Sequence, residues 1–481
     1  MNPNKAYTVL VIILIIAMLI GILGFQLNFP IPWKDEASFI YQAISWSEKN
    51  TLFSESLSQN RTIMWMPPGY MITLGVIYKI FGISLELARY VSLIFFMASF
   101  LIWIYIVKKY ISPVAILLVI LFFILPSSLV SANVARMDVC IVFFSLLCYL
   151  AIIKDYLTIA FGLVLVGILY HFNMVYMSIP LLGGTLVRLH KNKSIKGFFY
   201  VNTFELLFLL ISSVLFVCYC IYVLNNYADF SNDMETQFIR KLERPAFYHS
   251  IQNVSFITLL LLFATFSYFK SNWISLVTFL YSLALFLMYA IGQEMWYAIF
   301  YNISILSFFV GLWAMQTAKT KTPLLTVILI LTVIFFLKSN RQFSGMSPSF
   351  FDVPYMDIAT KLKIEGKILE ALNEAKLNVK HKNSAQSFTI SFSGKGNSIF
   401  FYLFAKKNGI TLIHDLPETI QKTPVADLCI VIKRQQDPLW ISQYEKHKLP
   451  AACKYGLITS DRNSEVSFFR IDHDQFVLSD G

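Results

Sequence analysis

Long apolar runs separated by short polar loops dominate the first two thirds of the chain. The first run, AYTVLVIILIIAMLIGILGF (6–25), is about 20 residues long, which is enough to cross the hydrocarbon of a bilayer. The bulky segment QLNFPIPW (26–33) follows in place of a small-residue cleavage site, so we expect a retained span and no signal peptide. The pattern predicts about eleven spans, near 8–26, 88–107, 112–130, 139–153, 157–170, 172–187, 200–224, 254–269, 274–291, 298–316 and 323–337.

One apolar run is too short to be counted with these spans. The segment PPGYMITLGVIYKIFG (67–82) opens with Pro67 and Pro68 and is interrupted by Lys79. Counting it as a span would invert every later loop, so we predict a helix in the outer membrane interface. The first outer loop then covers 27–87, and loops of such length without a function are uncommon.

The charges of the loops predict the orientation of the chain. If Lys5 is inside, the inner loops carry most of the loop lysines, which is the positive-inside pattern of a cell (inner or plasma) membrane protein with a cytoplasmic N-terminus. An odd number of spans then places the C-terminal tail outside. The inner basic residues are Lys108, Lys109, Lys154, Arg188, Lys191, Lys193, Lys196, Lys270, Lys319 and Lys321, and the outer acids are Asp35, Glu36, Glu48, Glu55, Asp138, Asp229, Asp233, Glu235, Glu243 and Glu294.

Composition supports a polytopic membrane protein. Of the 481 residues, 57% are hydrophobic and only 14% are charged, whereas soluble domains carry about 25% charged residues. So few charges cannot cover a solvated surface. The net charge of +11 is explained by lysines in the inner loops, and we expect membrane lipids and no nucleic acid as partners.

The composition of the chain changes at Lys338, because charged residues are frequent from there onward. The segment 356–378 has the period of an amphipathic helix, and four strand-like runs follow, at 387–393, 410–416, 427–433 and 466–472. We predict a transmembrane domain over 1–337 and a small soluble α/β domain over 338–481 on the outer side. In an oxidising compartment Cys429 and Cys453 could pair there, which the sequence leaves open.

An acidic pair, Asp35-Glu36, follows the first apolar run by about ten residues. Asp35 precedes a helical pattern, so it could be an N-cap that satisfies free N–H groups. It could equally be a carboxylate whose pKa is raised by an apolar outer loop and which acts as a general base. The pair alone does not decide between these roles.

The order of several motifs resembles the GT-C glycosyltransferases, in the branch of protein O-mannosyltransferases and lipid A aminoarabinose transferases. That family has an acidic pair in a long first outer loop, here Asp35-Glu36, and a "PPL"-type turn before a surface helix, here Pro67-Pro68-Gly69. An arginine at the outer start of the next span matches Arg89, and an Arg-x-Asp-like motif matches Arg136 and Asp138. The resemblance covers roughly 8–190, with a weaker likeness of layout through 337.

The resemblance implies roles for these residues. Asp35 matches the catalytic base, and Glu36 would position the acceptor or cap its helix. Asp138 would contact sugar, acceptor or metal, although it could also cap the following helix with Arg136 as its partner. Arg89 would bind the phosphate of the donor, although a lone arginine there could also be an interfacial anchor. In place of the basic residue that the family often has before a late span, this chain has Glu294, Trp296 and Tyr297. Further candidates are Arg136 and Arg61 for the phosphate, and His171 and Tyr297 for the site.

The predicted activity is inverting transfer of a sugar from a polyprenyl-phosphate donor to a protein, lipid or glycan acceptor on the outer face. Asp35, Glu36, Asp138 and His171 are residue types that bind a divalent metal, yet no tight ligand spacing demands one. The polar segment 226–247 is predicted to be a mobile loop that closes over the donor. The alternative is a transporter or flippase of lipid-linked sugars, which expects ionisable residues inside spans. Glu205, near the inner end of its span, is the one clear intramembrane acid.

Overall fold

The computed structural model describes residues 16, 29–30, 34–52, 64–112, 115–132, 134–192, 202–242, 251–292 and 298–315, and seven strands between 355 and 478. The chain divides into two compact units, each built from separate stretches. The first comprises Met1–Leu23, Ile63–Tyr70 and Arg89–Phe350, and the second comprises Gly24–Thr62, Met71–Ala88 and Phe351–Gly481.

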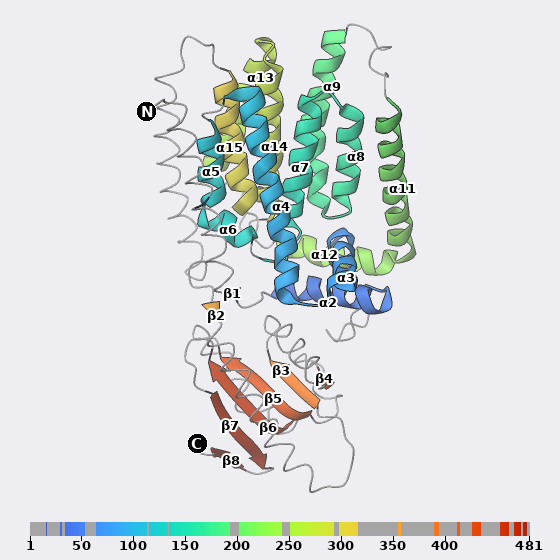
Figure 1. The fold of residues 1–481 in the computed structure, drawn as a ribbon, viewed down its shortest axis with the longest axis vertical. Helices are drawn as coiled ribbons and strands as arrows, with labels where there is room; N and C mark the ends of the chain where they lie inside the picture. The colour runs from blue at the N-terminus through green and yellow to red at the C-terminus, as the bar shows by residue number, and fades with distance from the viewer. Residues whose placement is uncertain are drawn as a thin grey trace. The chain divides into compact units, whose positions relative to one another are not determined.

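Helices, most of them apolar, make up most of the described part of the first unit (Figure 1). The central helix is α7 (Asp138–Ile153), which is buried along most of its length because α8 (Leu157–Ile168), α9 (Ser178–Asn192) and α14 (Trp273–Gly292) pack around it. The other elements are α4 (Leu85–Ile106, whose first four residues belong to the second unit), η2 (Val107–Ile111), α5 (Ile116–Ile124), α6 (Pro126–Ala132), η4 (Phe172–Met177), α11 (Thr203–Asn225), α12 (Tyr227–Leu242), α13 (Ile251–Phe269) and α15 (Ala298–Ala314).

Three described helices are long and apolar enough to cross a membrane, namely Leu85–Ile111, Thr203–Asn225 and Trp273–Ala290. They coincide with the predicted runs 88–107, 200–224 and 274–291. The other described runs are also helical but form shorter elements. The count of eleven spans therefore stays a prediction, and the runs 8–26 and 323–337 lie outside the described residues except for Ile16.

Two of the predicted runs are interrupted. The run 112–130 breaks at Leu125, whose ψ of 133° is not helical, and Pro126 opens the next helix because it has no N–H to donate. The run 172–187 begins as the 3₁₀ helix η4 and becomes α-helical only at Ser178. These interruptions are local and follow from backbone conformation at single residues.

The prediction of a mobile loop over 226–247 is wrong for most of that segment, because the structure has the helix α12 over Tyr227–Leu242. The polar composition suggested a loop, but Phe230, Met234 and Phe238 recur every four residues and so share one face of a helix. Figure 1 shows α12 running across the end of α11.

Glu205 lies near one end of its candidate span, in the first turn of α11. Asn202 is the N-cap of α11; its side chain accepts a hydrogen bond from the Glu205 amide at 2.9 Å and donates one to the Glu205 carboxylate at 2.6 Å. The first of these bonds satisfies a free N–H group of the first turn. The Glu205 carboxylate is thus bonded to the N-cap at the start of its helix.

The second unit contains α2 (Lys34–Lys49) and most of α3 (Gly69–Phe81), so the predicted helix over 67–82 is confirmed as a helix. A Cβ on Gly75 would lie 2.7 Å from Trp46 and 2.9 Å from the Ala43 carbonyl oxygen. The two helices therefore pack closely where α3 has no side chain. Lys79 lies over the Trp46 ring, 4.4 Å from its centroid, and donates to Asn50.

The described part of the tail forms strands. A two-residue ladder pairs β1 (Phe29–Pro30) with β2 (Tyr355–Met356), and a six-stranded mixed sheet has the order β4-β3-β5-β6-β7-β8. Strands lie in all four predicted runs, whereas β6 and β8 were missed and most of the predicted helix 356–378 lies outside the described residues. The strands are β3 (Thr389–Ser393), β4 (Thr411–Ile413), β5 (Ala426–Lys433), β6 (Cys453–Ser460), β7 (Val466–Asp472) and β8 (Gln475–Leu478).

The sheet register bears on the cysteine pair. Cys453 in β6 lies opposite Ala426 in β5, while Cys429 lies opposite Gly456. The two cysteines are thus three residues out of register, about 10 Å along the strands. A disulfide between them is excluded by this register, because bridged Cα atoms lie within about 7 Å.

Candidate functional site

The candidate residues are distributed over both units. Arg89, Arg136, Asp138 and His171 belong to the first unit, and Asp35 and Glu36 belong to the second. Asp35 lies in the first turn of α2, and its side chain is outside the described residues, as are Arg61 and Tyr297. The grouping of all these residues in one site therefore stays a prediction.

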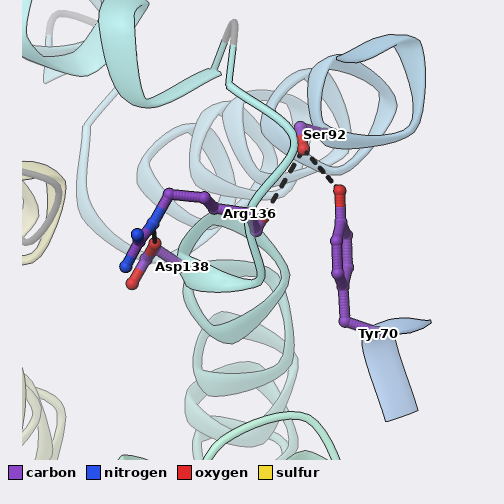
Figure 2. Close-up of polar contacts among 4 residues, drawn as sticks. All are labelled: Tyr70, Ser92, Arg136 and Asp138. Atoms are coloured by element: carbon purple, nitrogen blue, oxygen red, sulfur yellow. Dashed lines mark hydrogen bonds and ion pairs between the residues drawn. The ribbon is translucent and has the colours of Figure 1, made fainter. Parts of the chain in front are cut away.

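The structure brings Arg136 and Asp138 together at the start of α7. Arg136 Nε donates to Asp138 Oδ2 at 2.8 Å, and each side chain is only 3% exposed. Figure 2 shows the guanidinium and the carboxylate side by side. Met137, the N-cap of α7, makes no side-chain capping bond. Asp138 thus acts as the partner of a buried cation, and a charge in this setting is tolerated only when it is paired and hydrogen-bonded.

A hydroxyl bridge connects the Arg136 backbone to two other helices. Ser92 in α4 donates to the Arg136 carbonyl at 3.5 Å, and the Tyr70 and Ser92 hydroxyls are 3.4 Å apart (Figure 2). Because the Ser92 hydroxyl donates its one proton to the carbonyl, Tyr70 is the donor in the hydrogen bond between the two hydroxyls. Both bonds are long, so they align the segment and add little energy. Tyr70 and Ser92 are fully buried.

Arg89 lies one turn before Ser92 on α4 and is 1% exposed. Residues three apart share a helix face, so the Arg89 side chain starts on the face of α4 that meets the Arg136 segment. Among Arg89, Arg136 and Asp138 there are two guanidinium groups and one carboxylate. A guanidinium group has fixed, planar donors and can bind a phosphate through two hydrogen bonds.

The segment 64–69, which leads into α3 and belongs to the first unit, is hydrogen-bonded at both ends to other parts of that unit. The Met64 amide donates to Asp233 Oδ2 of α12 at 2.6 Å, and the Gly69 amide donates to the Leu169 carbonyl at 2.7 Å. A Cβ on Gly69 would lie 2.5 Å from that same carbonyl oxygen. Gly69 is therefore required by close backbone approach, and the Pro-Pro-Gly turn is held at a fixed place.

His171 has a structural task in the described geometry. It is the N-cap of η4, and its Nδ1 accepts a hydrogen bond from the Asn173 amide at 3.0 Å. The ring is 5% exposed. Nδ1 must be unprotonated to accept this bond, so Nε2 carries the proton of the neutral ring. The structure supplies no further observation for His171 as a site residue.

In the second unit Glu36 is fully buried on α2. Burial raises the pKa of Tyr78 well above its ordinary value, and the negative charges of Glu36 and of Glu86 raise it further. Tyr78 is consequently a neutral phenol, and its hydroxyl donates to the Ser84 carbonyl at 3.0 Å. Glu36 thus lies within electrostatic reach of α3 in an environment with little water.

No group of three or more histidine, cysteine, aspartate or glutamate side chains suited to a metal ion occurs among the described residues. Asp138 already shares one oxygen with Arg136. The described residues thus offer no ligand set for a metal ion, and the side chains of Asp35 and other candidates lie outside them.

Sequence reasoning missed three residues of this region: Tyr70, Ser92 and Asp233 in its role as an amide acceptor. A signal for Ser92 existed, because it follows Arg89 by one turn. Tyr70 and Asp233 could not be found in this way, since their partners lie 22 and 169 positions away in the sequence.

Comparison with known proteins identifies no family. No family model matches the chain, and no curated protein matches it. Two solved structures match along the chain. ArnT from Cupriavidus metallidurans in the apo state has 11% identity and a TM-score of 0.48, and the match covers 95% of this chain and 93% of that chain. ArnT from the same organism bound to undecaprenyl phosphate has 12% identity and a TM-score of 0.49, and the match covers 94% of this chain and 93% of that chain. At this identity and TM-score the likeness assigns neither a fold family nor an activity.

Proposed function

We propose that the protein is a membrane glycosyltransferase of the GT-C type that uses a polyprenyl-phosphate-linked sugar on the outer face of the membrane. The observation that carries the proposal is the buried Arg136–Asp138 pair, tied through Ser92 to the helix that carries buried Arg89. Buried arginines are costly to maintain in a membrane protein and are typical of functional sites. The order of the motifs along the first outer loop supports the same activity.

The proposed reaction needs one base and one anion site. An acceptor hydroxyl or amine attacks the anomeric carbon while the bond from that carbon to the phosphate oxygen breaks. Asp35 takes the proton of the acceptor, and polyprenyl phosphate leaves with the electron pair of the broken bond. Attack opposite to the leaving group inverts the anomeric configuration. Glu36 helps to position the acceptor, and Asp138 holds Arg136 and contacts the sugar.

The arginines act on the leaving group. Arg89 and Arg136 hold the phosphate and stabilise the charge that develops as the bond to the sugar breaks. An arginine keeps its charge throughout the cycle because its pKa is above 12. These roles account for two guanidinium groups near the starts of α4 and α7.

The rival interpretation, a transporter or flippase, expects ionisable groups in the middle of spans. In the three candidate spans that the structure describes, Asp, Glu, Lys and Arg residues lie only within five residues of either end. Glu205, the intramembrane acid expected from the sequence, lies in the first turn of α11 and is bonded to the N-cap Asn202. This distribution favours an enzyme whose chemistry takes place at the membrane surface.

The test compares wild type with Asp35→Asn and with Glu235→Gln, an exposed acid on α12. Each purified protein receives a radiolabelled polyprenyl-phosphate sugar, and bound donor and released polyprenyl phosphate are measured together with the melting temperature. We expect Asp35→Asn to bind donor as wild type does and to lose turnover by at least about 100-fold, while Glu235→Gln turns over normally. Turnover by Asp35→Asn at the wild-type rate would remove the assigned base. Transfer of intact donor across vesicles without release of polyprenyl phosphate would favour the flippase.

A further inference from the structure

The far end of α4 joins an apolar stripe to a group of cations. Tyr90, Ile94, Leu101 and Tyr105 are all exposed and recur at intervals of one or two helical turns, so they share one face of α4. The helix continues without a break into η2, where Lys108 and Lys109 are exposed. On a helix long enough to span, such a stripe faces acyl chains.

Two ammonium groups from different segments converge on Tyr105. Lys109 Nζ donates to the Tyr105 hydroxyl at 3.1 Å and lies 5.4 Å from the ring centroid. Lys154, which follows α7, lies 5.2 Å from the same centroid. Lys109 also lies 5.5 Å from the Tyr110 ring. The aromatic faces attract both cations and hold them at one place.

These cations have no carboxylate partner among the described residues. Among the described residues at this end, an ion pair joins Arg188 to Asp155 at 3.7 Å, whereas the hydrogen bonds and ring contacts of the Lys109 and Lys154 side chains are all to tyrosines. Two like charges held against one ring repel each other. An anion that binds between them would relieve this repulsion, and the Tyr105 hydroxyl offers it a further hydrogen-bond donor.

We propose that Lys109, Lys154 and Tyr105 bind the phosphate of an anionic phospholipid whose acyl chains lie along Leu101 and Ile94. The apolar stripe that ends at the cations distinguishes a lipid from free phosphate, since only a lipid satisfies both parts. The site is about 24 Å along α4 from Arg89, so it is separate from the proposed donor site. The positive-inside pattern places it in the cytoplasmic leaflet.

The test uses the full chain in a mild neutral detergent with short-chain lipids. Dioctanoyl phosphatidylglycerol, dioctanoyl phosphatidylcholine and inorganic phosphate are titrated separately, and the melting temperature and the mass of the bound species are recorded. The variants are Lys109→Gln/Lys154→Gln and, as a matched control, Lys108→Gln, which removes a neighbouring exposed charge that has no contact with the tyrosines. Tyr105→Phe keeps the ring and removes the hydroxyl.

We expect phosphatidylglycerol to raise the melting temperature of wild type in a saturable manner. The double variant should bind it at least about 10-fold more weakly, Tyr105→Phe a few-fold more weakly, and Lys108→Gln like wild type. Equal stabilisation by phosphatidylcholine, or equal loss in Lys108→Gln, would overturn the site. An equal shift with inorganic phosphate alone would overturn the lipid as its occupant. If the double variant melts much lower than wild type without lipid, the affinity of Tyr105→Phe for phosphatidylglycerol is the test instead: weaker binding supports the site, and binding equal to wild type contradicts it.

Discussion

The two ends of α7 each carry an arginine–carboxylate pair, and the pairs differ in almost every physical respect. At the start of the helix Arg136 and Asp138 lie 2.8 Å apart with side chains only 3% exposed. Beyond its end Arg188 and Asp155 lie 3.7 Å apart, and the Asp155 side chain is 63% exposed. The first pair keeps two charges out of water, while the second is screened by it. Burying the charges at the start of α7 costs desolvation free energy, whereas the exposed pair beyond its end costs little. The candidate residues Arg136 and Asp138 lie at the end that bears this cost.

The largest effect is expected from breaking the buried pair. Asp138→Leu would leave the Arg136 guanidinium buried without its carboxylate, and we expect a loss of about 3–5 kcal/mol in unfolding free energy. The double variant Arg136→Met/Asp138→Leu should recover most of this loss, because no charge is then buried. Denaturant unfolding in detergent measures both variants. A single variant as stable as wild type would contradict the burial of the pair.

A smaller loss is expected where backbones approach closely near the candidate site. Gly69→Ala places a methyl group against the Leu169 carbonyl, and we expect a loss of about 1–3 kcal/mol. Gly183→Ala is the control, because its new methyl group meets only the movable end of the Leu280 side chain. Melting temperatures of the two variants should differ clearly. Equal values would mean that the Pro-Pro-Gly turn is not held as described.

The hydroxyl bridge should matter more for activity than for stability. Tyr70→Phe removes one long hydrogen bond and Ser92→Ala removes both, so we expect each variant to lose only about 1 kcal/mol of stability. Both variants should lower turnover of the donor in the same proportion, and the double variant should be no worse than the worse single variant, because the bonds act in series. Additive effects on turnover would argue against a shared role in positioning Arg136.

The smallest effect is expected at the exposed pair. Arg188→Gln removes a screened ion pair, and we expect a change of less than about 1 kcal/mol that shrinks further in high salt. Unfolding measured at low and high salt tests this. A loss as large as that of Asp138→Leu would abolish the distinction between the two ends of α7.

The predictions that the structure confirms rest on patterns of neighbouring residues. Apolar length and period are properties of adjacent residues, so the helices at 88–107, 200–224 and 274–291 and the strands in four runs of the tail could be predicted. The helix α12 was mistaken for a loop because polar content was weighed above the four-residue spacing of Phe230, Met234 and Phe238. Glu205 does lie near the end of a candidate span, but its bonds with the N-cap Asn202 were not predicted.

Contacts between distant residues could not be predicted. The pair Arg136–Asp138 is two residues apart and was foreseen, but the bond from Met64 to Asp233 crosses 169 positions. The cysteine pairing depended on strand register, which turn and ladder geometry fix and which composition does not. The assembly of Asp35 with Arg89 and Asp138 is the same kind of long-range question and remains a prediction.

The most direct measurement of the central claim is the binding of polyprenyl phosphate, the proposed leaving group. Its dissociation constant should be measured for wild type, for Arg89→Gln, and for Arg188→Gln as the matched removal of an arginine at the other end of the bundle. If the buried arginines hold the phosphate, Arg89→Gln should weaken binding by about 10- to 100-fold, and Arg188→Gln should bind as wild type does. Unchanged binding by a folded Arg89→Gln variant would contradict the account.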